Sequence, residues 1–121
     1  QLFHDAVVSG KTICGPVIAS AIEKALKMGE SNACMKRIVA APTAGSAGIV
    51  PGLMLAFQEI YGFSDEQMIK VLFNAGAVGY LAMRNATVAG AVGGCQAEVG
   101  VASAMAALIL PVQVARMQNI C

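Results

Sequence analysis

A cysteine and a glutamate within a glycine-rich stretch are the residues of this sequence best suited to chemistry. The stretch reads Gly90-Ala-Val-Gly-Gly-Cys-Gln-Ala-Glu-Val-Gly100, so Glu98 follows Cys95 by three residues. Glycine permits backbone shapes closed to other residues and lets a ligand approach the main chain. A cysteine that opens a helix lies at the positive end of the helix dipole, which favours the thiolate that binds metal or attacks carbon. The stretch is also compatible with a glycine-rich turn around a buried, inert cysteine, since free cysteine is among the most buried residue types.

A second stretch of small residues carries hydroxyl groups, Ile38-Val-Ala-Ala-Pro-Thr-Ala-Gly-Ser-Ala-Gly48. It precedes an apolar segment, and a loop that opens a helix offers free N–H groups to an anion. Thr43 and Ser46 are therefore candidates for anion binding, although they are also typical helix-capping residues. Glu98 has two interpretations as well, as an acid or base and as a cap for N–H groups.

The composition excludes several classes of function. Hydrophobic residues make up 57% of the 121 residues and charged residues 12%, with a formal charge of +1 and no Trp. A soluble domain usually carries about 25% charged residues, so much apolar surface must be buried. The charge balance gives no basic surface for nucleic acid. Pro111 and Gln113 interrupt the long uncharged segment near the end, which argues against a membrane span.

Helical periodicity dominates the sequence. It predicts helices over residues 17–28, 50–60, 65–82 and 96–110, after a poorly periodic lead-in over residues 1–16. Gly29 is expected to end the first helix. Ser64-Asp-Glu-Gln67 is a capping box for the third. The only β-like run is Ile38-Val-Ala-Ala. The prediction is an all-α fold, a compact bundle of about four to five helices in one domain over residues 1–121, with functional loops that precede helices.

Four cysteines occur, Cys14, Cys34, Cys95 and Cys121, and none forms a C-x-x-C pair. With no secretory signal in view, this predicts free thiols in a reducing, cytoplasmic compartment. A lone cysteine cannot hold a zinc ion or an iron–sulfur cluster.

Three stretches resemble the signatures of iron–sulfur-dependent L-serine dehydratases, in their alpha (catalytic) chain or domain. They cover residues 38–52, 85–90 and 93–107, and Tyr61-Gly-Phe-Ser-Asp-Glu66 also fits the family pattern. The resemblance implies deamination of L-serine to pyruvate and ammonia without pyridoxal phosphate. It further implies a [4Fe-4S] cluster held by three cysteines, whose open iron acts as a Lewis acid on the serine hydroxyl.

The resemblance also implies roles for individual residues. Cys95 matches the first cluster cysteine, and Gly94, Gln96 and Glu98 support its loop. The run Thr43, Ala44, Gly45 and Ser46 matches a cradle for the substrate carboxylate. Asn85 is expected near the substrate, and no residue is assigned as the general base. A beta subunit or beta domain and a homo-oligomer are the implied partners, and no nucleic acid or membrane is.

The sequence departs from the family pattern at its end. The other two cluster cysteines are expected in a Leu-Gly-Leu-x-Cys-Asp-Pro stretch and a Pro-Cys-Ile stretch, and neither occurs. Residues 108–121 leave the pattern, and Cys121 lacks the expected context. We therefore expect a truncated fragment with no intact cluster and no turnover of its own. The alternatives are a non-catalytic helical module that associates through its apolar surface, and a thiol enzyme with Cys95 as nucleophile.

Overall fold

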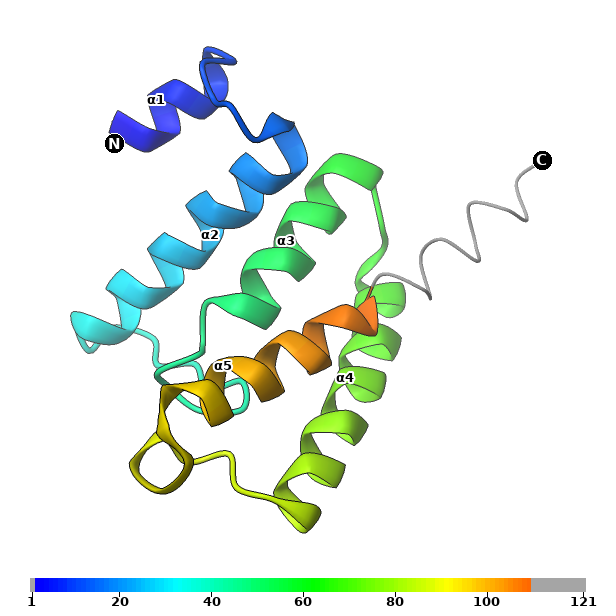
Figure 1. Ribbon diagram of the computed structural model, residues 1–121. Helices are drawn as coiled ribbons and strands as arrows, with labels where there is room; N and C mark the ends of the chain where they lie inside the picture. Colours follow the sequence, from blue (N-terminus) through cyan, green and yellow to red (C-terminus); the bar gives the residue numbers. More distant parts are fainter. Residues whose placement is uncertain (1, 110–121) are drawn as a thin grey trace.

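Five helices make up the computed structural model, which describes residues 2–109. They are α1 (Leu2–Val8), α2 (Gly15–Ala33), α3 (Ile49–Tyr61), α4 (Asp65–Asn85) and α5 (Gly90–Ala107). No strand occurs within that part of the chain. In Figure 1, α2, α3, α5 and α4 lie side by side, and α1 lies beyond the beginning of α2. The all-α prediction is confirmed.

The N-terminal part of the bundle differs from the predicted pattern. Residues 2–8 form a helix in the segment that was expected to be an irregular lead-in. Helix α2 continues to Ala33, so the prediction that Gly29 ends it is wrong. The chain turns away only afterwards, where Met35 adopts a left-handed φ of 53°. The side chain of Asn32 then accepts a hydrogen bond of 2.9 Å from the N–H of Val39 and donates one of 2.8 Å to its carbonyl oxygen. The backbone of Val39, within the β-like run, is thus hydrogen-bonded without a strand.

Both ends of α3 and the start of α4 agree with the predicted helices to within one residue, whereas α4 continues past the predicted end at residue 82 to Asn85. Gly62 ends α3 in the left-handed conformation, with φ 68°. Ser64 then caps α4, and the reciprocal contacts with Gln67 complete the predicted capping box. Two orphan N–H groups at the start of α4 are satisfied in this way.

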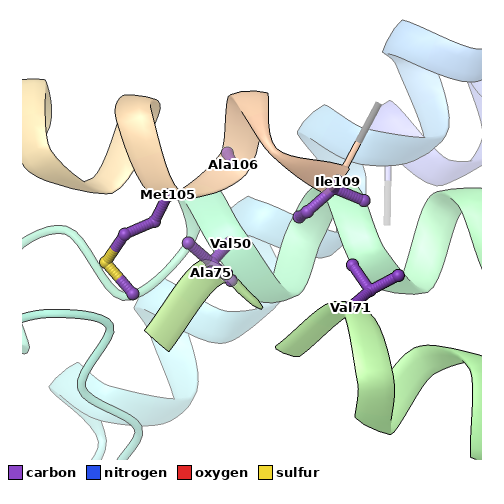
Figure 2. Close-up of a cluster of buried hydrophobic side chains, with 6 residues drawn as sticks. All are labelled: Val50, Val71, Ala75, Met105, Ala106 and Ile109. Carbon is purple, nitrogen blue, oxygen red and sulfur yellow. The ribbon is translucent and has the colours of Figure 1, made fainter. Parts of the chain in front are cut away.

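The core lies between α3, α4 and α5 (Figure 2). Its buried side chains are those of Val50, Val71, Ala75, Met105, Ala106 and Ile109. Gly79 in α4 makes room for Met105, whose sulfur lies 2.9 Å from the place that a Cβ atom would take. Gly76 has nothing within 4 Å of the corresponding place, so a close approach of this kind occurs at Gly79 and not at Gly76.

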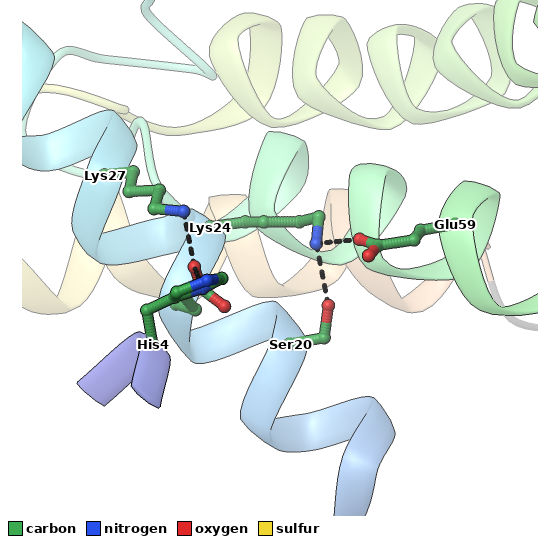
Figure 3. A network of polar contacts seen from close by, with 6 residues as sticks. His4, Ser20, Lys24, Lys27 and Glu59 are labelled. Atoms are coloured by element: carbon green, nitrogen blue, oxygen red, sulfur yellow. Dashed lines mark hydrogen bonds and ion pairs between the residues drawn. The ribbon is translucent and has the colours of Figure 1, made fainter. Parts of the chain in front are cut away.

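A polar network joins α1, α2 and α3 (Figure 3). Glu23 is 8% exposed. Its Oε1 lies 2.7 Å from His4 Nδ1 and also forms an ion pair with Lys27. Lys27 and, after it, His4 hold the pKa of the Glu23 carboxyl below its ordinary value of 4.5, against the opposing effect of burial. Lys24 bridges α2 and α3 by pairing with Glu59 and donating to Ser20 Oγ at 2.8 Å.

Candidate functional site

The loop before α3 turns its hydroxyl groups towards the protein. Ser46 is 3% exposed, and its Oγ lies 3.2 Å from Thr43 Oγ1 and 3.4 Å from the carbonyl oxygen of Ala41. Neither hydroxyl caps α3, because Gly48 occupies the N-cap position and no side chain caps the helix. The capping alternative for Thr43 and Ser46 is therefore wrong, and their hydroxyls serve the loop itself.

The same loop leaves its main chain free for a ligand. The N–H groups of residues 43–46 donate no hydrogen bond to any other residue in the described range. Ala44 and Gly45, in the middle of this run, are exposed to solvent, whereas Ser46 is buried. Successive free N–H groups in a turn favour an anion. This geometry suits the predicted cradle for a carboxylate.

The cysteine stretch is helical with a break in the middle. Residues 90–93 form a turn of α5, and the helix is interrupted at Gly94, with φ 75° and ψ 173°. That combination of angles is open almost only to glycine. Cys95 is therefore the first residue of the longer part of α5. The sequence predicted a helix from Gln96, and the additional turn before the break was not foreseen.

The thiol of Cys95 faces solvent. Cys95 is a free, exposed cysteine, and its neighbours Gly94 and Gln96 are exposed as well. The alternative of a buried, inert thiol is therefore wrong. Position and exposure are those of a residue that can reach a metal or an electrophile.

Glu98 joins the two stretches. Its Oε1 accepts a hydrogen bond of 2.6 Å from Thr43 Oγ1, across 55 residues of sequence. Both carboxylate oxygens lie 3.0 Å from the place that a Cβ atom of Gly45 would take, and Oε2 lies 2.4 Å from the corresponding place at Gly90. The glycines thus let the carboxylate fit between the loop and the start of α5, and Figure 1 shows these two segments beside each other.

Asn85, the remaining polar candidate, takes no part in the contact between Thr43 and Glu98. Asn85 is exposed at the end of α4 and donates to the carbonyl oxygen of Leu81 at 2.8 Å. Thr87 Oγ1 accepts from the N–H of Ala89 at 3.1 Å, which pins the turn that leads into α5. Asn85 as a substrate contact stays a prediction.

The described residues form no evident metal site. They contain no group of three His, Cys, Asp or Glu side chains placed for a metal ion. Cys14 and Cys34 lie at the two ends of α2, and Cys121 lies outside the described residues. Cys95 as one of three cluster cysteines stays a prediction.

Sequence reasoning placed Glu98 beside the cysteine but missed its contact with Thr43. Part of the signal for this contact lay in the sequence, since Gly45 stands in the loop-forming segment and Gly90 at the start of the helix-forming one. Only the fold shows that the carboxylate of Glu98 lies against both glycines.

The family model described as "Serine dehydratase alpha chain" matches residues 3–115. The chain belongs to the serine dehydratase alpha chain family. The match passes Ala107, after which we expected the family pattern to end.

Curated relatives agree with this assignment. A probable L-serine dehydratase alpha chain of Bacillus subtilis is 54% identical over 99 residues, which are 82% of this chain and 33% of that protein. The L-serine dehydratase alpha chain of Peptoniphilus asaccharolyticus is 47% identical over 84% of this chain and 35% of its own length. L-serine dehydratase 1 of Escherichia coli is 44% identical over 69% of this chain and 18% of its own length.

The chain therefore spans about a third of the length of the two alpha chains. No solved structure matches it. None of the helices within residues 2–109 is both long enough and apolar enough to cross a membrane.

Proposed function

We propose that this chain supplies part of the active site of an L-serine dehydratase, which converts L-serine to pyruvate and ammonia. The hydrogen bond between Thr43 and Glu98 is the observation that supports it, because it brings the two signature stretches of the family together. The free N–H groups of residues 43–46 bind the substrate carboxylate. Cys95, one helical turn before Glu98, is a cluster ligand close to that loop.

The [4Fe-4S] cluster that the resemblance implies would supply a Lewis acid for the departing serine hydroxyl. This chain contributes Cys95 to it, and the further ligands lie outside residues 2–109. Pyridoxal phosphate takes no part. The chain works in the cytoplasm as part of a homo-oligomer with a beta subunit or beta domain.

A segment exchange tests this function. Residues 9–108 replace the matching segment of the Bacillus subtilis alpha chain, and the chimera is expressed with the rest of that enzyme. We expect L-serine-dependent pyruvate formation, its loss in Cys95→Ala, and its retention in Cys34→Ala, which changes an exposed cysteine at the end of α2. An inactive chimera that folds and binds its cluster would contradict the proposal, as would full activity of Cys95→Ala.

The chain alone should not turn over serine. Its described residues offer one cluster ligand, whereas three cysteines are implied. After anaerobic incubation with ferrous iron and sulfide, we expect neither the visible absorbance of a stoichiometric cluster nor pyruvate. Both signals together would refute this part of the proposal.

A non-catalytic association module remains the second candidate, because α4 carries an exposed apolar face. The face forms a groove of about 460 Å³. Its residues are Ile69, Leu72, Phe73, Gly76, Ala77 and Tyr80. A patch of this kind favours contact with another protein surface. This alternative predicts a stable oligomer with or without iron, and an inactive chimera.

A further inference from the structure

Glu98 carries a partly buried carboxylate. Within residues 2–109, no Lys, Arg or His side chain forms an ion pair with it. Glu23, the buried carboxylate of the polar network, has two such partners in Lys27 and His4. A charge removed from water is costly unless it is paired. The contrast indicates that Glu98 is arranged to meet a cation that the described residues do not provide.

The two oxygens of this carboxylate differ in their contacts. Oε1 accepts the hydrogen bond from Thr43, whereas Oε2 accepts none from the residues that the structure describes. Oε2 lies against Gly90, and both oxygens lie against Gly45, so no side chain covers them on these two sides. Gly45 and Ala44 are exposed, which leaves the carboxylate within reach of a small molecule at the loop.

A negative charge at this place conflicts with a site for a carboxylate alone. An anion held by the N–H groups of residues 43–46 would be repelled by Glu98, which touches the same loop. A zwitterion removes the conflict, since its ammonium group lies one carbon from its carboxylate. The ammonium donates to Oε2, and the carboxylate binds the N–H groups.

We infer that Glu98 binds the α-ammonium group of the amino-acid substrate and thereby selects amino acids over hydroxy acids. The inference rests on the proposed function and deepens it. Glu98 also positions the loop by accepting the hydrogen bond from Thr43. A substitution can separate this positioning role from the binding of an ammonium group. Glu98→Gln keeps an oxygen that accepts from Thr43 and removes the charge that an ammonium requires.

The test is an NMR titration of the ¹⁵N-labelled chain with L-serine and with L-glycerate. L-glycerate keeps the carboxylate and the β-hydroxyl and replaces the ammonium by a hydroxyl. We expect L-serine to shift the amide signals of residues 43–46 and of Gly90. L-glycerate should bind about tenfold or more weakly, as the loss of a charged hydrogen bond implies. Glu98→Gln should weaken L-serine binding equally and abolish the preference, whereas Glu30→Gln, an exposed glutamate of α2, should bind like the wild type.

Each other outcome overturns the inference. Equal affinity of wild type for the two ligands, or unchanged L-serine binding by Glu98→Gln, would remove the ammonium role while the carboxylate cradle stands. Absence of any L-serine-dependent shift would refute a site made by these residues. The chimera assay reports on the dehydratase function separately, so the two failures are distinguishable. Thermal melting of Glu98→Gln establishes that the variant is folded.

Discussion

Replacing Thr43 by valine should uncouple the two signature stretches. Valine keeps the shape of threonine and removes the hydroxyl that donates to Glu98 at 2.6 Å. A hydrogen bond to a charged group contributes about 1.5–3 kcal/mol to the free energy of unfolding. Water reaches the partly buried carboxylate of Glu98 and replaces part of this contribution, so we expect a loss of about 1–2 kcal/mol. For a chain of this size, the melting temperature should fall by about 4–8 °C.

A double-mutant cycle isolates this contact. The free energy of unfolding is measured by urea denaturation for the wild type, Thr43→Val, Glu98→Ala and the double variant. We expect a coupling energy of about 1–2 kcal/mol, because each single substitution breaks the same hydrogen bond. The matched cycle pairs Thr43→Val with Glu30→Ala and should be additive within about 0.5 kcal/mol. A Thr43–Glu98 coupling no larger than that of the control would refute the reasoning.

Four further perturbations test the geometry around this contact and the fold. Gly90→Ala should lower the free energy of unfolding by about 1–3 kcal/mol, because its Cβ would stand 2.4 Å from Glu98 Oε2. Gly76→Ala, with open space at the same place in mid-helix, should raise it by up to about 1 kcal/mol in the same denaturation assay. The contacts of Glu23 with Lys27 and His4 lower its pKa, so the stability that they contribute is present above pH 4.5 and is lost as the pH falls through the lowered pKa. In thermal melts over that pH range, the melting temperature of Glu23→Gln should therefore fall less than that of the wild type. Ser64→Ala should cost about 1 kcal/mol in urea denaturation by removing the capping box, and an unchanged midpoint would contradict that role.

Local patterns in the sequence predict local structure well here. The capping box of Ser64 and the helical periodicity that follows it specify the start of α4 because both depend on neighbours within one or two turns. Gly29 misleads because a glycine ends a helix only where the chain has reason to turn, and here the helix continues to Ala33. Helix α1 escaped prediction because it has seven residues and buries none of them, so its sequence carries no apolar stripe.

The candidate site divides in the same way. Residue types and their spacing suffice to single out Thr43, Ser46, Cys95 and Glu98 as chemically promising. The hydrogen bond that joins two of them spans 55 residues and depends on how α3 and α5 pack, which no local pattern encodes. The break of α5 at Gly94, where φ is 75°, and the exposure of Cys95 next to it are likewise visible only in the fold.

The central claim is that the hydroxyl loop and the cysteine helix form one site through Thr43 and Glu98. Nuclear Overhauser contacts between the Thr43 methyl group and the side-chain protons of Glu98, in a uniformly labelled chain, test it most directly. The hydrogen bond of 2.6 Å predicts clear contacts between these groups. A Thr43 methyl group with contacts only inside its own loop, and none to Glu98, would contradict the account.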